Sequence, residues 1–319
     1  MSLSRTSAPV GSSPLVEGGF RVDGGHLKQS QPGRPLISVV TVVRNGQQTI
    51  ERTIQSVLAQ SYPNIEYIVV DGASDDGTLD ILRRYGERID YWISEPDGGI
   101  YEAMNNGIKL CTGQAIGLLN CGDYYEPDFV ERLLKVLPEG QDVSDIVLYS
   151  DFSVIYEDVA LCQKIRSTMR IWGGMSICHQ AMLIGRSVYE SAGLYDSDFR
   201  LAGDYEYLLR MACRGTRFVH VPYYGVNFVD GGASLLMRRR SLQEAAVASK
   251  RHFGAYSPQH IRFLVCYYYW NLFVYVYAKN TVAAIFGKSI VDRVKSVKLK
   301  LTSNTTAIGR QRSNTKDLR

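Results

Sequence analysis

The stretch Leu36-Ile-Ser-Val-Val-Thr-Val-Val43 is an apolar run, rich in β-branched residues, that ends just before Asn45-Gly46. A run of this kind predicts a strand that is buried on both faces of a parallel sheet. Residues 47–60 then show the 3.6-residue period of an amphipathic helix. Its apolar stripe consists of Ile50, Ile54, Val57 and Leu58. The stretch therefore predicts a strand followed by a helix, the first unit of an α/β fold.

The same alternation of strand and helix continues to residue 137. Further strands are predicted at 65–70, 89–94 and 115–120, and further helices at 78–85 and 99–110. Strands that alternate with helices favour a mainly parallel central sheet flanked by helices. Ligands of such folds bind at the carboxyl ends of the strands, so the polar loops that follow these strands are expected to share one edge.

The second half of the chain is less regular. Strands are predicted near 146–150 and 181–184, and helices at 204–214 and 241–253. Residues 230–234, Asp-Gly-Gly-Ala-Ser, predict a mobile loop that could close over a bound donor and exclude water. The arginines at 238–240 would lie near the phosphates of such a ligand, or form an ordinary solvated surface.

Composition favours one globular enzyme domain with appendages. The 319 residues are 45% hydrophobic and 21% charged, which is enough to bury one sizeable core. The six cysteines form no CxxC pair and no cluster with histidine at zinc-ligand spacing, which indicates a reducing compartment. A formal net charge of +4, with no recognisable nucleic-acid-binding motif, argues against a nucleic-acid partner.

The two ends of the chain differ from the catalytic domain, which is predicted at 35–255. Residues 1–34 are rich in Gly, Ser and Pro and contain no apolar run long enough for a signal peptide, so export by that route is not expected. We expect these residues to form a disordered N-terminal tail. Residues 288–319 form a basic tail that we expect to be flexible. Such a tail suits an anionic membrane surface, although it could equally be a merely solvated end.

Residues 256–287 are predicted to form an aromatic helix. The segment 263–278 contains no charged residue and is rich in tyrosine. It falls short of the roughly 20 residues that a spanning helix needs, and its tyrosines are typical of a membrane interface. We therefore expect a helix that lies in the membrane surface. The alternatives are a helix packed on the catalytic domain or in a dimer interface, and a transmembrane span that would have to accommodate Lys279.

Two acidic loops follow apolar strands at the predicted ligand-binding edge. They are residues 71–76, Asp-Gly-Ala-Ser-Asp-Asp, and the turn that contains Asp123. A carboxylate at this edge can accept hydrogen bonds from a ribose or a base, or hold a divalent cation against a diphosphate. Asp and Gly are also good turn formers, so a plain turn is the alternative for these loops and for Asp97 in the loop after the third strand.

The chain also carries an ordered set of short motifs. They are Ile37-Ser-Val-Val-Thr-Val-Val-Arg-Asn45, Gln55-Ser-Val-Leu-Ala-Gln-Ser-Tyr62, Val70-Asp-Gly-Ala-Ser-Asp-Asp-Gly-Thr78, Glu95-Pro-Asp-Gly-Gly-Ile-Tyr-Glu-Ala-Met-Asn105, Leu119-Asn-Cys-Gly-Asp123, His179-Gln180, Ala192-Gly-Leu-Tyr-Asp196 and Ala202-Gly-Asp-Tyr-Glu-Tyr-Leu-Leu-Arg210. In this order they resemble family 2 glycosyltransferases. The fourth and fifth motifs resemble the bacterial polysaccharide-assembly branch of that family. Each motif alone is weak, but the ordered set is specific.

This resemblance implies a GT-A fold and a nucleoside-diphosphate sugar donor, linked to UDP or GDP. It also implies a Mg or Mn ion, and usually inversion at the anomeric carbon. The acceptor would be a lipid-linked glycan of exopolysaccharide or lipopolysaccharide assembly, met on the inner face of the plasma membrane. The Gln-x-x-Arg-Trp signature of processive synthases is absent from the sequence, which favours addition of one sugar per encounter.

The resemblance also assigns roles to single residues. An inverting transfer needs a base for the acceptor hydroxyl and an electrophile for the departing diphosphate. Asp123 fills the last place of a DxD-like motif and would bind the metal ion. Asp204 opens an ED-like motif and would be the catalytic base, with a helix N-cap as its alternative role. The implied donor-binding residues are Thr41, Val43, Asn45, Asp71, Ser74, Asp76, Asp97, Gly122 and His179.

Departures from the family motifs and alternative roles limit these assignments. Many family members carry a second acid after Asp71, which contacts the base, but Gly72 stands here; the acid before Asp123 is likewise replaced by Gly122. These losses favour the alternative of a non-catalytic nucleotide-sugar-binding scaffold, whereas retention of both Asp123 and Asp204 favours an enzyme. His179 would touch the diphosphate or the acceptor, or be a structural histidine. The absence of a GxGxxG motif and of a Walker loop argues against a dehydrogenase or a nucleotidyltransferase.

Overall fold

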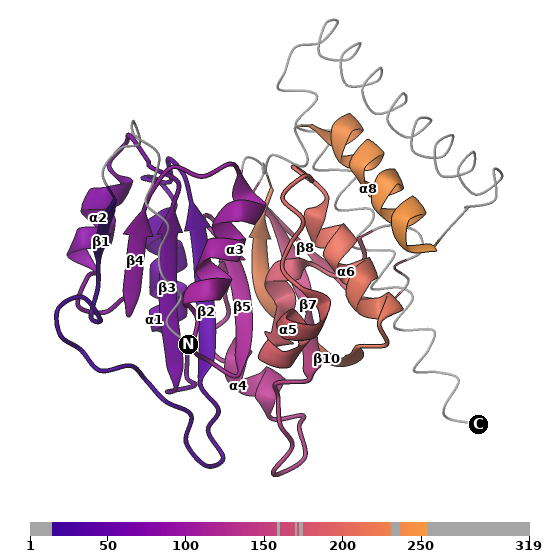
Figure 1. Cartoon of the computed structure of the whole chain (residues 1–319), viewed down its shortest axis with the longest axis horizontal. Coiled ribbons are helices and arrows are strands. Elements are labelled where there is room, and N and C mark those ends of the chain that lie inside the picture. Colours follow the sequence, from indigo (N-terminus) through magenta and orange to yellow (C-terminus); the bar gives the residue numbers. More distant parts are fainter. Residues whose placement is uncertain (1–14, 158–159, 170, 172–174, 231–236, 254–319) are drawn as a thin grey trace, which may run out of the picture.

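The computed structural model describes residues 15–157, 160–169, 171, 175–230 and 237–253. In this part of the chain ten strands form one sheet in the order β1-β4-β3-β2-β5-β9-β7-β10-β6, with β8 paired to β7 (Figure 1). The strands are β1 (Val16–Gly18), β2 (Ile37–Val43), β3 (Ile65–Asp71), β4 (Tyr91–Ser94), β5 (Ala115–Asn120), β6 (Tyr124–Tyr125), β7 (Ile146–Tyr156), β8 (Leu161–Ile165), β9 (Met182–Gly185) and β10 (Arg217–Val229).

Helices cover both faces of the sheet. They are α1 (Ile50–Leu58), α2 (Thr78–Arg84), α3 (Ile100–Leu110), α4 (Phe129–Leu134), α5 (Arg186–Ala192), α6 (Gly203–Cys213), α8 (Arg238–Phe253) and the short 3₁₀ helix η3 (His179–Ala181). One core contains buried side chains of α3, α5 and α6, which lie on the near face in Figure 1. The other core contains buried side chains of α1, α2 and α4. Helix α8 packs against α6.

The parallel half of the sheet confirms the predicted α/β fold. Strands β4, β3, β2 and β5 are all parallel neighbours. Every residue of β2 and β3 is buried, because both faces of these central strands are covered by helices. The helices α1, α2 and α3 make the crossovers, within a few residues of the predicted ranges.

The second half of the sheet is mixed rather than parallel. Strand β9 lies antiparallel to both β5 and β7, and β10 runs parallel to β7. The predicted strands near 146–150 and 181–184 exist, and the first extends to Tyr156. Strand β10 was not among the predicted strands, although it has 13 residues. This strand carries two register shifts and alternates incompletely, so its period is weak in the sequence.

The segment 15–34 corrects the expectation of a disordered N-terminal tail. Strand β1 pairs antiparallel with the edge strand β4. Arg21 forms an ion pair with Glu66, whose side chain is fully buried, and Lys28 forms one with Asp90 at 2.9 Å. A buried carboxylate without a partner is costly, so these two cations hold the segment against the domain. Residues 1–14 lie outside the described part.

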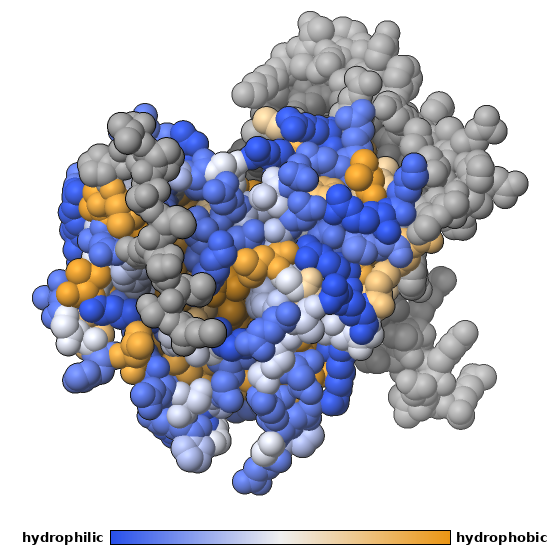
Figure 2. Space-filling model, viewed as in Figure 1, coloured by the Kyte–Doolittle hydropathy of each residue, from blue (hydrophilic) through white to orange (hydrophobic). Residues whose placement is uncertain are grey.

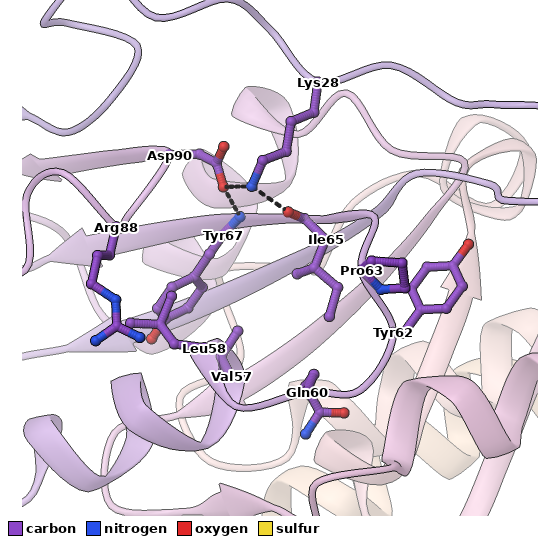
Figure 3. A pocket seen from close by; sticks show the side chains of 10 residues that line it. All are labelled: Lys28, Val57, Leu58, Gln60, Tyr62, Pro63, Ile65, Tyr67, Arg88 and Asp90. Atoms are coloured by element: carbon purple, nitrogen blue, oxygen red, sulfur yellow. Dashed lines mark hydrogen bonds and ion pairs between the residues drawn. The ribbon is translucent and has the colours of Figure 1, made fainter.

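Figure 3 shows the surroundings of Lys28, which lines a cavity of about 260 Å³. Lys28 Nζ donates to the carbonyl oxygen of Ile65 at 2.7 Å, and Asp90 Oδ2 accepts a second hydrogen bond from Tyr67 N at 2.8 Å. The cavity lies where β3 begins and α1 ends, at the amino edge of the parallel strands. It is therefore remote from the carboxyl edge, where the sequence predicts the ligand site.

Several predictions for the C-terminal region lie outside the described residues. These are the aromatic helix at 256–287, the basic tail at 288–319 and most of the loop at 230–234. Among the helices that the structure describes, none is both long and apolar enough to cross a membrane. The near face of the described region is mostly hydrophilic, with apolar residues gathered in separate patches (Figure 2).

Candidate active site

The candidate site lies at the carboxyl edge of the sheet, where β2, β3 and β5 end side by side. This edge carries two groups of sequence-predicted residues. One group lies in the loops after β2, β3 and β4. The other group joins the loop after β5 to η3 and to the start of α6.

Asp71 organises the first group. Its carboxylate is fully buried and accepts hydrogen bonds from Ser74 N at 2.9 Å and from Ser94 Oγ at 2.6 Å. Ser74 Oγ in turn accepts a bond from Asn45 N at 2.7 Å, and Asn45 Oδ1 accepts one from Asp75 N at 3.0 Å. Asn45 has φ +53°, a left-handed turn that asparagine tolerates. These hydrogen bonds connect the loop after β2 to the loop after β3.

Asp76 fastens the same loops from the outside. Its carboxylate accepts bonds from Gln47 N at 3.0 Å and Thr78 N at 2.9 Å. Burial alone would raise the pKa of Asp76, but the bonds from Thr78 and Gln47 bring it below its usual value. Asp76 is therefore an anion that shapes the turn at neutral pH.

Thr41 and Val43, which the resemblance implies as donor-binding residues, are buried in the fold. Thr41 is fully buried inside β2, and its Oγ1 accepts a hydrogen bond from Tyr67 at 3.0 Å. The side chain of Val43 belongs to the core, and its carbonyl oxygen accepts a bond from Gly72 N at 2.8 Å. Their donor-binding role stays a prediction, and their observed contacts are with the fold.

Asp97 stands opposite Gly72 at the mouth of this group. Asp97 Oδ1 accepts a bond from Gly99 N at 2.8 Å. A Cβ atom at Gly72 would lie only 2.5 Å from Asp97 Oδ2, so Asp97 occupies the space beside Gly72. Burial raises the pKa of Asp97, while Gly99 N and the charge of Arg44 oppose this shift.

Asp123 is the centre of the second group. Its side chain is buried, and Oδ1 accepts a bond from Val229 N at 2.9 Å while Oδ2 accepts one from Gln180 Nε2 at 2.7 Å. Burial raises the pKa of Asp123 to about 6, although these bonds and the charges of His179 and Arg52 oppose the shift. The preceding Gly122 has φ +101°, a conformation that an acid at this position would strain.

Asp204 lies at the start of α6 and faces His179. Asp204 Oδ2 lies 3.2 Å from His179 Nδ1, and Oδ1 accepts bonds from Tyr205 N at 2.8 Å and Tyr101 Oη at 3.2 Å. Burial alone would raise the pKa of Asp204, but the hydrogen bond to His179, helped by those from Tyr205 N and Tyr101, lowers it. Ala202 occupies the N-cap position of α6, so the alternative of a capping role for Asp204 does not hold.

The short helix η3 brings the two key carboxylates together. Its consecutive residues His179 and Gln180 contact Asp204 and Asp123 respectively. His179 Nε2 also lies 3.3 Å from Asn120 Nδ2, at the end of β5. The sequence analysis did not single out Gln180, Asn120 or Tyr101, although each lies inside a quoted motif. Only the fold shows that these side chains meet.

The capacity of this edge to hold a metal ion depends on Asp123. The described residues contain no group of three or more His, Cys, Asp or Glu side chains arranged as a metal site. Each oxygen of Asp123 accepts one hydrogen bond and keeps further lone-pair capacity. A buried carboxylate with a raised pKa lacks compensating positive charge. These features fit a cation held by one protein carboxylate, with ligand oxygens and water as its other ligands.

Comparison with solved structures defines the class of fold. The chain resembles S. aureus TarS 1-349 with a TM-score of 0.54 and 15% identity, over 79% of this chain and 75% of that fragment. It resembles the mannosyltransferase PcManGT from Pyrobaculum calidifontis, in complex with GDP-Man and Mn2+, with a TM-score of 0.55 and 17% identity, over 94% of this chain and 93% of that one. These likenesses confirm the predicted GT-A fold of glycosyltransferases.

Sequence comparison places the chain in a family. The profile described as Glycosyl transferase family 2 matches residues 38–191. An uncharacterized glycosyltransferase of Mycobacterium tuberculosis is 35% identical over 181 residues, which cover 56% of this chain and 69% of the relative. A PGL/p-HBAD biosynthesis glycosyltransferase of Mycobacterium bovis is 28% identical over 234 residues, 68% of this chain and 86% of the relative. The chain belongs to glycosyltransferase family 2, as its motifs predicted.

Proposed function

We propose that this glycosyltransferase moves one sugar from a UDP- or GDP-linked donor to a lipid-linked glycan acceptor, with inversion at the anomeric carbon. The observation that carries the proposal is the bridge through η3, which connects Asp123 and Asp204 by adjacent side chains. Two carboxylates held together at the carboxyl edge suit the two tasks of an inverting transfer. A scaffold without turnover would need neither.

Asp204 is the catalytic base in this proposal. Its lowered pKa keeps the carboxylate ionised at neutral pH, so it can accept a proton from the acceptor hydroxyl. Tyr101 and His179 hold the two oxygens in place, which limits the movement of the base. About one fifth of the Asp204 side chain is exposed, so an acceptor can reach it from solvent.

Asp123 is the proposed metal ligand. A Mg or Mn ion bound there would neutralise charge on the donor diphosphate and favour its departure. Gln180 Nε2 and Val229 N orient the buried carboxylate. The structure of PcManGT with Mn2+ and GDP-Man supports a divalent ion and a nucleotide sugar for a protein of this fold.

The donor nucleotide would lie over the loops after β2, β3 and β4. Asn45, Asp71, Ser74, Asp76 and Asp97 surround this space. The complex of S. aureus TarS with UDP-GlcNAc supports a nucleotide sugar in the same fold, with a TM-score of 0.55.

The acceptor and location rest on the sequence and on one relative. The name of the M. bovis relative, a PGL/p-HBAD biosynthesis glycosyltransferase, directs attention to glycolipid acceptors beside the polysaccharide intermediates implied by the motifs. The uncharged aromatic segment 263–278 and the basic C-terminal end suit a peripheral protein on the inner face of the plasma membrane.

The test is Mn-dependent release of nucleoside diphosphate from a panel of UDP- and GDP-sugars. Asp204→Asn is expected to lower turnover by about 10³-fold while nucleotide binding persists. Asp123→Ala is expected to abolish the Mn-dependent release of nucleoside diphosphate. The matched control is Asp80→Asn, because Asp80 is an exposed carboxylate that pairs with Arg83 on the surface of α2. Turnover that survives both active-site substitutions would overturn the mechanism, and absence of nucleotide-sugar binding would favour the scaffold.

A further inference from the structure

Three side chains from three elements form a chain of hydrogen bonds at the site. Asn120 is the last residue of β5, His179 begins η3 and Asp204 lies in the first turn of α6. Asn120 Nδ2 lies 3.3 Å from His179 Nε2, and His179 Nδ1 lies 3.2 Å from Asp204 Oδ2. The imidazole is therefore held at both ring nitrogens, and only 12% of its side chain is exposed.

The chemistry of Asn120 and Asp204 determines which atoms donate in these two hydrogen bonds. An amide nitrogen can only donate a hydrogen bond, and an ionised carboxylate can only accept one. Nε2 of His179 must therefore present its lone pair to Asn120. In the neutral imidazole the single proton then resides on Nδ1, which faces Asp204.

The reversed orientation of Asn120 would break this order. If Oδ1 instead faced Nε2, a neutral ring would carry its proton on Nε2, and the lone pair of Nδ1 would face the lone pairs of Asp204; only a ring protonated on both nitrogens would donate to both partners. In the observed orientation Asn120 Oδ1 is buried and has no hydrogen-bond partner among the described residues. An unsatisfied buried acceptor costs free energy, so this cost accompanies the donation from Asn120 Nδ2 to His179.

We propose that Asn120 is a positioning residue that fixes His179 in its Nδ1–H tautomer, so that His179 donates a hydrogen bond to Asp204. The catalytic meaning of this tautomer rests on the proposed role of Asp204 as the base. His179 then orients the base and stabilises its anion, while Tyr101 and Tyr205 N hold the other oxygen. This role differs from the contact with diphosphate or acceptor that the motif implied for His179.

Asp123 also lies close to His179, and the neighbouring Gln180 contacts it. Among the described residues, the carboxylate of Asp123 accepts hydrogen bonds from Gln180 Nε2 and Val229 N and not from the ring of His179. Asn120 determines which ring nitrogen carries the proton because it contacts Nε2 directly.

The test is ¹⁵N NMR of the full chain labelled at histidine, since ring ¹⁵N shifts distinguish a protonated nitrogen from a bare one. His179→Gln removes one set of signals and assigns His179. His220 is an internal reference of opposite tautomer, because its Nε2 lies 2.8 Å from the Asp151 carboxylate. We expect a bare Nε2 and a protonated Nδ1 for His179. A wild-type His179 with a protonated Nε2, whether or not Nδ1 also carries a proton, would overturn the proposal.

Asn120→Asp tests the same interaction with a side chain of nearly equal size. A carboxylate at 120 accepts only, so the Nε2 of His179 is expected to become protonated while the His220 signals stay unchanged. The kcat is expected to fall at least about tenfold, with the Kd for the nucleotide within about twofold of wild type. An unchanged His179 spectrum in this variant would contradict the role of Asn120.

The design separates failure of this inference from failure of the proposed function. If Asp204→Asn retains full turnover while His179 shows the Nδ1–H tautomer, the positioning holds and the base is wrong. If Asp204→Asn is inactive while wild-type His179 carries its proton on Nε2, the base holds and the positioning is wrong.

Discussion

At the amino edge of the sheet, each buried carboxylate meets a cation, whereas at the carboxyl edge the buried carboxylates meet mainly neutral donors. Glu66 pairs with Arg21 and Asp90 pairs with Lys28. Asp123 instead accepts bonds from a glutamine amide and a backbone N–H. Both edges belong to the same parallel strands, so the difference lies in the partners and not in the architecture.

This difference separates structural carboxylates from chemical ones. A carboxylate paired with a cation and further donors, as Glu66 is with Arg21, Ser38 and Thr112, has little remaining affinity for a ligand. A buried carboxylate without a full positive counter-charge retains affinity for a proton or a metal ion. Burial raises the pKa of Asp123 to about 6, which is the affinity for a proton expected of such a carboxylate. Uncompensated burial therefore marks the carboxyl edge as the reactive one.

The largest expected effect comes from removing an ion pair at the amino edge of the sheet. Arg21→Ala leaves Glu66 buried without its cation, and removal of one partner of such a pair typically costs about 3–5 kcal/mol in the free energy of unfolding. Urea denaturation measures this cost. The control is Arg83→Ala, which breaks an exposed pair with Asp80 and is expected to cost at most about 1 kcal/mol. Equal costs for the two variants would show that the amino edge does not depend on charge pairing.

The second largest expected effect is a pH dependence of the unfolding free energy that Asp123 causes at the carboxyl edge. The folded pKa of Asp123 is about 6, against 3.8 for a free side chain, so the folded state binds the proton more tightly. Its stability contribution is complete below about pH 4 and is lost as the pH rises through 6. Relative to Asp123→Asn, wild type without metal should lose about 2–3 kcal/mol of unfolding free energy between pH 4 and pH 7.

Urea denaturation in the presence of a chelator, at a series of pH values, measures this loss. Asp80→Asn, a change of an exposed carboxylate, should run parallel to wild type over the same range. A difference between wild type and Asp123→Asn that stays constant with pH would mean that burial does not raise the pKa of Asp123.

The local elements of the fold were predictable, but the pairings that make the two edges were not. The strands 37–43 and 115–120 and the helix at 203–213 carry clear periods over a few residues, so their sequence alone indicates them. Arg21 and Glu66 are 45 residues apart, and Lys28 and Asp90 are 62 apart. No local pattern links residues so distant, and the Gly- and Ser-rich composition of 1–34 predicted disorder instead.

The candidate site shows the same division. The motifs singled out Asp123, Asp204 and His179, and the strand order explains why their loops share one edge. The specific contacts join η3 to residues 57 and 25 positions away, at Asp123 and Asp204. Side-chain orientation at such contacts depends on packing of whole elements. The sequence therefore indicated which residues matter at this edge, whereas only the structure shows what each one touches.

The smallest expected effect concerns the space between the loops after β3 and β4. Gly72 has no left-handed φ, so glycine is needed there for room and not for backbone conformation. A Cβ at this position would lie 2.5 Å from Asp97 Oδ2 and 3.6 Å from Arg44 Cβ, so the carboxylate would have to move. Gly72→Ala is expected to cost about 1–2 kcal/mol in the free energy of unfolding.

The same change made in the Asp97→Ala background separates this contact from any general cost of a methyl group at Gly72. Without the carboxylate the nearest remaining contact is the ordinary one to Arg44, so Gly72→Ala should then cost less than about 0.5 kcal/mol. A difference of about 1 kcal/mol between the costs of Gly72→Ala in the two backgrounds would show that Asp97 occupies the space beside Gly72 at the carboxyl edge. Equal costs in both backgrounds would mean that the two loops relax independently, and that Asp97 moves freely at the mouth of the nucleotide site.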